Sequence, residues 1–135
     1  MYIENYLFRG KSIFDGNWYE GSLLVFPSGR AKILKWNQAD LNFDQIEVRP
    51  ETVGQYTELN DKNGKSIFEG DIVVLNEDVK KTFDVDDGEV IYGRGGFYVK
   101  EFNVLNSLNT LASWDWILRG KVIGNIHDNP ELMKI

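Results

Sequence analysis

A cluster of carboxylates stands just before a glycine, which is a pattern that calcium ions select. The cluster consists of Asp84, Asp86 and Asp87, followed by Gly88, and hard cations bind oxygen ligands of this kind. The spacing does not fit a calcium loop, because a loop beginning at Asp84 needs glycine where Glu89 stands and an acid where Gly95 stands. We therefore predict a solvated acidic turn and neither a metal ion nor a cofactor.

Two further constellations fall short of a catalytic site. The run Gly93–Gly96 would let backbone amides approach a phosphate, but the strand-like residues 97–99 follow it where a nucleotide loop needs a helix. His127 is the only histidine, and the chain has no Gly-x-Ser-x-Gly motif to supply a nucleophile for it. We predict a hairpin turn at Gly93–Gly96 and no enzymatic activity. A small enzyme that uses carboxylates stays open as an alternative.

Aromatic and basic side chains offer candidates for partner binding. Trp114 and Trp116 flank Asp115, and on a strand both indoles would lie on one face. Core packing is the simpler interpretation; the alternative is a surface patch that contacts a protein or stacks on single-stranded bases. Basic residues near the expected Gly93–Gly96 hairpin would serve a nucleic-acid interface. The full candidate set is Trp114, Trp116, Lys80, Lys81, Arg94 and Lys100.

The elements that must hold these residues are mostly strands. Two hairpins are predicted, one across residues 27–30 and one across residues 93–96, because β-branched and aromatic runs flank both turns. A late strand is expected at Lys121–Ile126. Helical periodicity is scarce, with a turn near residues 37–43, a stretch around 105–112 and a helix start at Asn129 and Pro130 as its candidates.

One heptapeptide occurs twice in nearly identical form. Gly10–Gly16 reads GKSIFDG and Gly64–Gly70 reads GKSIFEG. Each copy has a glycine at both ends, where turns are favoured, and an apolar pair between them. Two explanations of the repeat are open: it is a device that starts strands, or it is a chance recurrence. A shared device predicts the same backbone turn in both copies, whereas different conformations would mean coincidence.

Composition places the chain among soluble globular proteins. Its 135 residues suit one cooperative unit, and an aromatic content of 13% excludes a disordered chain. The net charge of −6 argues against a protein that mainly grips phosphate backbones. Cysteine is absent, and the sequence shows neither a secretory signal nor an apolar run long enough to span a membrane. We predict a cytoplasmic protein.

Several spaced motifs resemble the YopX family, whose members are encoded by bacteriophages and prophages. The run 49–73, containing VGQYTELNDKNGKSIFEGDIV, is the most specific of them, and GNIHDNPEL at 124–132 resembles the closing motif of the family. The start, with Phe8–Lys11 and Gly16–Trp18, also fits. Glu58 is a departure, because the family usually has glycine there, and a non-glycine residue argues against a positive-φ turn at this position.

The resemblance implies a mainly β fold with an SH3-like barrel and little helix. Within a single YopX-like unit, residues 1–57 would form an N-terminal β lobe and residues 58–135 the barrel lobe. It implies no catalytic residues. The leading hypothesis is a non-catalytic phage accessory protein that binds a protein partner or copies of itself through strand edges and exposed aromatics. A nucleic-acid-binding module of SH3-like barrel type is the alternative.

Overall fold

The chain folds as two β units, each with its own hydrophobic core. A computed structural model describes residues 7–75, 87–93, 95–102, 108–110 and 120–133. The first unit is Met1–Tyr56 and the second is Thr57–Ile135. The predicted mainly β fold is confirmed, since the described ranges contain no helix beyond two short 3-10 turns, η2 (Pro50–Thr52) and η3 (Pro130–Leu132). Neither turn is long enough to cross a membrane.

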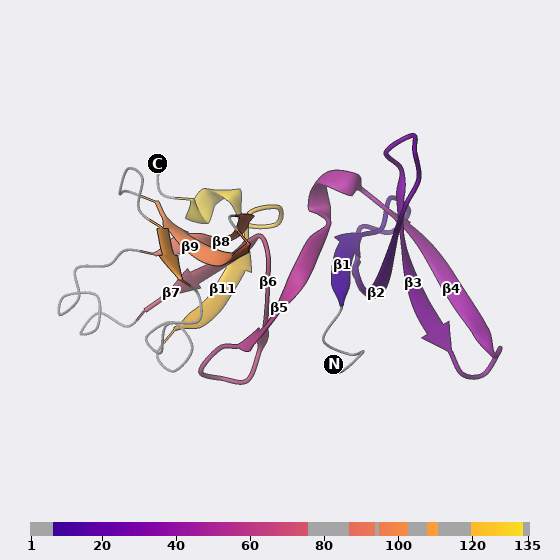
Figure 1. Cartoon of the computed structure of the whole chain (residues 1–135), viewed down its shortest axis with the longest axis horizontal. Coiled ribbons are helices and arrows are strands. Elements are labelled where there is room, and N and C mark those ends of the chain that lie inside the picture. Colours follow the sequence, from indigo (N-terminus) through magenta and orange to yellow (C-terminus); the bar gives the residue numbers. More distant parts are fainter. Residues whose placement is uncertain (1–6, 76–86, 94, 103–107, 111–119, 134–135) are drawn as a thin grey trace. The chain divides into compact units, whose positions relative to one another are not determined.

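The first unit is an antiparallel sheet in the order β4-β3-β2-β1-β5 (Figure 1). Its strands are β1 (Phe8–Lys11), β2 (Trp18–Val25), β3 (Ala31–Asn37), β4 (Asn42–Val48) and the start of β5 (Gly54–Asn60). The hairpin predicted across residues 27–30 is confirmed, because Val25 pairs with Ala31 and Leu23 with Ile33. Gly29 closes the turn with a φ of 93°, a conformation that glycine adopts without steric strain.

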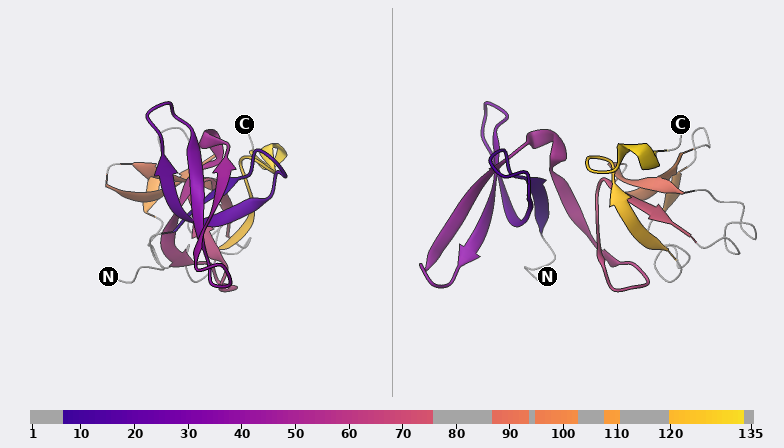
Figure 2. Two further views of the ribbon diagram at one scale, coloured as in Figure 1. Left: turned by 90° about the vertical axis from the view of Figure 1, so that its right-hand side faces the viewer. Right: turned by 180° about the vertical axis from the view of Figure 1, so that it is seen from behind.

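A second hairpin, β3–β4, occupies the segment for which we predicted a helical turn, and that prediction is wrong. Trp36 pairs with Phe43 and Asn37 with Asn42. The Asn37 side-chain oxygen accepts hydrogen bonds from the backbone N–H groups of Ala39 (3.0 Å) and Asp40 (3.2 Å). An asparagine that bonds the backbone in this way stabilises a tight turn in place of a helix start. The ribbon of this hairpin is visible from two further sides in Figure 2.

The core of the first unit lies on one side of its sheet. Its fully buried members are Ala31, Ile33 and Val48, and Phe8, Tyr19, Leu23, Ile46 and Val53 pack against them. Gly10 lies directly over this core, where an added Cβ would come within 2.8 Å of the Val48 side chain. The first glycine of the repeated heptapeptide is therefore needed for close packing and not for a turn.

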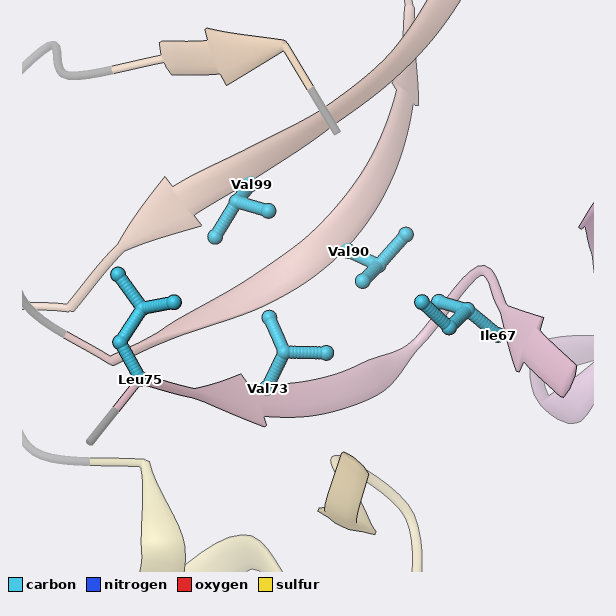
Figure 3. Packing of buried hydrophobic residues seen from close by; sticks show 5 residues of the cluster. All are labelled: Ile67, Val73, Leu75, Val90 and Val99. Carbon is cyan, nitrogen blue, oxygen red and sulfur yellow. The ribbon is translucent and has the colours of Figure 1, made fainter. Parts of the chain in front are cut away.

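The second unit contains the end of β5, the short strand β6 and an open antiparallel sheet. The strands are β6 (Ser66–Phe68), β7 (Asp71–Val74), β8 (Gly88–Gly93), β9 (Gly96–Glu101), β10 (Leu108–Thr110) and β11 (Lys121–Asn125), and the open sheet has the order β10-β9-β8-β7-β11. The hairpin predicted at residues 93–96 and the late strand at Lys121 are both confirmed. The core side chains in Figure 3 are Ile67, Val73, Leu75, Val90 and Val99.

The SH3-like barrel is not confirmed. Closure of the second sheet would require its edge strands β10 and β11 to pair, and no such pairing occurs between their described residues. A barrel forms only when strand tilt and register bring the two edges of a sheet together. Here β6 pairs with β5, and β11 pairs with β7 with a register shift between Val122 and Gly124.

The two copies of the heptapeptide adopt different conformations, so their similarity is a coincidence of sequence. In the first copy, β1 ends at Lys11 and the residues after it form a turn, which leaves Ile13 and Phe14 exposed by 42% and 83%. In the second copy, the equivalent Ile67 and Phe68 lie in β6 and are buried, with exposures of 0% and 4%. The closing glycines do share a positive φ, 71° at Gly16 and 92° at Gly70.

Asp61 is the polar centre of the turn that precedes β6. One carboxylate oxygen accepts the backbone N–H groups of Asn63 and Lys65, both at 2.9 Å, and the other accepts that of Val122, also at 2.9 Å. Burial opposes ionisation, but these three N–H groups and the charge of Lys65 outweigh it and lower the pKa of Asp61. Asp61, within the motif that resembles the family, therefore hydrogen-bonds both the turn before β6 and the distant strand β11.

The closing motif is also a set of interlocked turns. The Asn125 side-chain oxygen accepts the backbone N–H groups of His127 (3.0 Å) and Asp128 (2.9 Å), and the Asn129 side-chain oxygen accepts that of Asn125 (3.2 Å). Asn129 precedes η3 as predicted, but its side chain does not cap that helix. An added Cβ at Gly124 would lie 2.4 Å from the Asn129 side-chain oxygen. Glycine is therefore required for this turn to close.

Glu58 contradicts the expectation drawn from its side chain, because its φ is 68°. A non-glycine residue in this left-handed region is strained by about 1–2 kcal/mol. We therefore expect Glu58→Gly to raise the free energy of unfolding by about 0.5–1 kcal/mol, since the strain relieved exceeds the added chain entropy. Urea unfolding followed by circular dichroism measures the change. Glu58→Ala keeps the strain and serves as the control; an equal gain in both variants would contradict this explanation.

Candidate binding surface

The carboxylates of the described residues serve the fold and form no metal-binding cluster there. Within the ranges that the structure covers, no group of three or more His, Asp and Glu side chains is placed to hold a metal ion. The buried carboxylates of Asp61 and Asp71 accept backbone N–H groups, with Phe68 as the donor to Asp71 at 2.8 Å. These acids organise turns.

Most of the predicted binding residues lie outside the described residues. They are Lys80, Lys81, Arg94, Trp114 and Trp116. Lys100 is described: it is exposed on β9 and lies opposite Glu89 of β8. Burial raises the pKa of Glu89, and the positive charge of Lys100 opposes that rise. Lys100 is thus one member of a cross-strand charge pair.

A cationic and aromatic surface that the sequence did not single out covers the first unit. Residues directly opposite each other in an antiparallel pair share a face, and every second residue of a strand points to that face. The pairs Leu24–Lys32, Lys32–Glu47 and Trp36–Phe43 therefore lie on the side opposite the core residue Ile33. We call this side of β2–β4 the outer face; its residues are Trp18, Glu20, Ser22, Leu24, Phe26, Arg30, Lys32, Leu34, Trp36, Phe43, Gln45 and Glu47.

An exposed aromatic pair marks one end of the outer face. The rings of Trp36 and Phe43 meet edge to face, with centroids 5.2 Å apart and an interplanar angle of 73°. Trp36 remains 50% exposed and Phe43 47% exposed. The Trp36 indole N–H donates to the Gln38 side-chain oxygen at 2.9 Å, which restrains the ring. Such rings offer apolar area to a ligand at little entropic cost.

A small cavity with two cations marks the other end of the outer face. It has a volume of about 310 Å³ and is lined by Phe26, Pro27, Ser28, Arg30 and Lys32. The Lys32 ammonium lies 5.6 Å from the centre of the Phe26 ring and donates to the Gln45 side-chain oxygen at 3.1 Å. The ring and the amide are both neutral, so the charge of Lys32 is not cancelled by these contacts.

Arg30 has an acidic partner on the same face. Its guanidinium donates twice to the Glu47 carboxylate, at 2.6 Å and 2.9 Å. This hydrogen-bonded pairing raises the pKa of Arg30 and lowers the pKa of Glu47, to which the charges of Arg30 and Lys32 also contribute. Glu47 is thereby fixed against Arg30, and the set of Arg30, Lys32 and Glu47 carries a net positive charge.

Cations also surround an aromatic ring on the neighbouring part of the same sheet. Lys11 pairs with Trp18 across β1 and β2. The guanidinium carbon of Arg9 lies 4.5 Å from the centre of the Trp18 ring, and the Lys11 ammonium lies 5.8 Å from it. Contacts of this kind are favourable cation–π interactions. The pairing of aromatic rings with basic side chains therefore recurs within the first unit.

Sequence reasoning missed the outer face because it assigned residues 37–43 to a helical turn. On a helix, Trp36 and Phe43 would not face one another across a ladder. A usable signal was present, since Lys32, Leu34 and Trp36 alternate along one strand directly after a predicted hairpin turn. Two paired strands with this alternation would have placed the aromatic and basic residues on one side.

Comparisons with known proteins cover nearly the whole chain. A family model described as YopX protein matches residues 7–134. No curated protein matches the chain. Among solved structures, the chain is similar to protein EF1440 from Enterococcus faecalis, with 25% sequence identity and a TM-score of 0.55. That match covers 94% of this chain and 96% of the other.

Proposed function

This chain belongs to the YopX family, and on that premise we propose that it is a non-catalytic accessory protein that acts by binding another macromolecule. The outer face is the surface that makes the contact. The observation that carries the proposal is the exposed Trp36–Phe43 pair, because aromatic side chains held in place at a surface are typical of binding sites. The phage or prophage setting expected from the family fits an accessory role.

The distribution of exposed apolar side chains supports a binding role for the first unit. Among the described residues, its exposed large hydrophobic side chains are Ile13, Phe14, Leu24, Val25, Trp36, Leu41 and Phe43, whereas those of the second unit are Tyr92 and Ile123. Exposed apolar area concentrated on one part of a protein is typical of an interaction surface. The sequence favours a protein or a second copy of the chain as partner, with a nucleic acid as the alternative, and each of these would use this unit.

Paired affinity capture tests the proposal. Wild-type protein and the Trp36→Ser/Phe43→Ser variant serve as baits in host lysate, and bound proteins and nucleic acids are both quantified. Both side chains are only about half exposed and contact each other, so the variant should be modestly less stable, and the assay is run well below its thermal unfolding midpoint. We expect at least one ligand that the wild type retains and the variant loses. If both baits retain the same ligands, the outer face is not the binding surface.

Self-association is measured separately by light scattering over a range of concentrations. A dimer formed through the outer face would dissociate in the Trp36→Ser/Phe43→Ser variant and persist in Tyr92→Ser. Tyr92 is a matched control, because it is 55% exposed and meets Phe97 edge to face at 5.1 Å in the second unit. A dimer that survives the double substitution would place self-association elsewhere.

A further inference from the structure

We propose that the outer face binds single-stranded nucleic acid, with bases stacked on its aromatic rings and phosphates placed at Lys32 and Arg30. The inference rests on the proposed function, since it names the partner of the same surface. Three observations carry it: the exposed aromatic pair, the cations that accompany the rings, and the cavity beside Phe26.

The aromatic rings supply stacking surfaces along one sheet face. Phe26 and Trp36 lie near opposite ends of the outer face, and Phe43 stands beside Trp36. Since a strand rises about 3.3 Å per residue, the line from Arg30 to Trp36 along β3 extends about 20 Å. A surface of that length can accept several unstacked nucleotides. Stacking on aromatic rings tolerates any base, because every base has a π face.

The cations are placed where phosphates would lie between stacked bases. Lys32 sits over the edge of the cavity, held by the Phe26 ring and the Gln45 side chain. Arg30 lines the same cavity, and its pairing with Glu47 orients the guanidinium without using all of its donors. Farther along the sheet, Arg9 and Lys11 flank Trp18, and Glu20 lies opposite Arg9 on β2.

Charge complementarity favours an anionic ligand on this surface. The chain as a whole has a net charge of −6, yet on this side of β1–β4 the four basic side chains, Arg9, Lys11, Arg30 and Lys32, outnumber the two acids, Glu20 and Glu47. An acidic peptide could pair with the basic side chains. Its carboxylates would not bind to the aromatic rings, because ring faces carry partial negative charge and repel carboxylates. A duplex would keep its bases stacked inside and leave the aromatic rings unused. A single strand can stack its bases on the aromatic rings and place its phosphates at the basic side chains.

Fluorescence anisotropy with a labelled oligothymidylate of about 15 nucleotides tests the inference. We expect binding at low salt and weaker binding of a duplex of the same length. Trp36→Ser/Phe43→Ser should weaken binding roughly tenfold or more, as loss of a stacking platform does. Lys32→Gln should reduce the slope of log affinity against log salt by about 0.7, the value for one phosphate contact on a single strand.

Matched controls in the second unit separate this site from general charge and aromatic effects. Tyr92→Ser removes an exposed aromatic side chain, and Lys121→Gln removes an exposed lysine of β11. Neither should change the affinity by more than about twofold. The inference is overturned if the wild type does not bind the single strand at low salt, or if the outer-face variants bind as the wild type does. If, in addition, a protein ligand is lost on Trp36→Ser/Phe43→Ser, the proposed function still stands.

Discussion

Replacing Phe68 by alanine should lower the free energy of unfolding of the second unit by about 3–5 kcal/mol, the usual cost of removing a buried aromatic side chain. The same substitution at Phe14 should change the free energy of unfolding of the first unit by less than about 0.5 kcal/mol. Both residues occupy the same position of the repeated GKSIF string. They differ in environment, since Phe68 is 4% exposed and Phe14 is 83% exposed.

Urea unfolding of the four variants Phe68→Ala, Phe14→Ala, Ile67→Ala and Ile13→Ala measures the difference. Amide exchange resolves which unit has lost stability. Ile67→Ala should cost about 2–5 kcal/mol, because Ile67 is fully buried in the core of Figure 3. Similar losses at both copies would mean that the first copy is packed as the second is, contrary to its exposed turn.

Replacing Asp61 by alanine should lower the free energy of unfolding of the second unit by about 3 kcal/mol or more. The substitution leaves the N–H groups of Asn63, Lys65 and Val122 without their acceptor, and each unsatisfied buried donor costs about 1–3 kcal/mol. Asp61→Asn should lower the free energy of unfolding by less than Asp61→Ala does. Its amide oxygen can still accept the N–H groups of the turn, while its amide N–H₂ faces the Val122 N–H. Thermal and urea unfolding rank the three proteins.

The contribution of Asp61 should also depend on pH in a defined direction. Its pKa in the folded protein is lower than the ordinary value of 3.8, so the unfolded chain binds more protons between the two values. The stabilisation is therefore complete above about pH 3.8 and is lost as the pH falls through the folded-state pKa. The difference in stability between wild type and Asp61→Asn should shrink over that acidic range. A constant difference would show that the charge of Asp61 is not what stabilises the turn.

Asp15 provides a control for general effects of acid. The Tyr19 hydroxyl donates to its carboxylate at 2.6 Å, and the Asn17 backbone N–H donates at 2.8 Å. These bonds lower the pKa of Asp15 as well, but the group is exposed to solvent. Asp15→Asn should therefore leave the stability of the second unit unchanged at every pH. A loss there would indicate a global effect of charge removal.

Much of the strand pattern could be predicted from local sequence. The hairpins at residues 27–30 and 93–96 follow from turn residues between β-branched runs, and both are present. The failures have local causes too. A helical turn was predicted near residues 37–43, yet the Asn37 side chain bonds the backbone of a tight hairpin turn. Glu58 argued against a positive φ, yet its φ is 68°.

Two properties of this fold are not determined by local sequence: the burial of the repeated heptapeptide and the closure of a barrel. Identical residues are buried in one copy and exposed in the other, because burial depends on which strands lie nearby and not on the string itself. Closure of a barrel depends on the register between strands far apart in the chain. The outer face was missed for a related reason, since it exists only when β2, β3 and β4 are correctly paired.

The hydrogen bond from the Val122 backbone to Asp61 has a consequence for synthesis of the chain. It joins positions 61 residues apart, and β7 likewise needs β11 as its second neighbour. While the ribosome is still making residues 76–120, the Asp61 turn lacks one of its donors and β7 has an open edge. The first unit draws its pairings from residues already made. During that part of synthesis the strands of the first unit already have their partners, whereas the second unit still lacks β11.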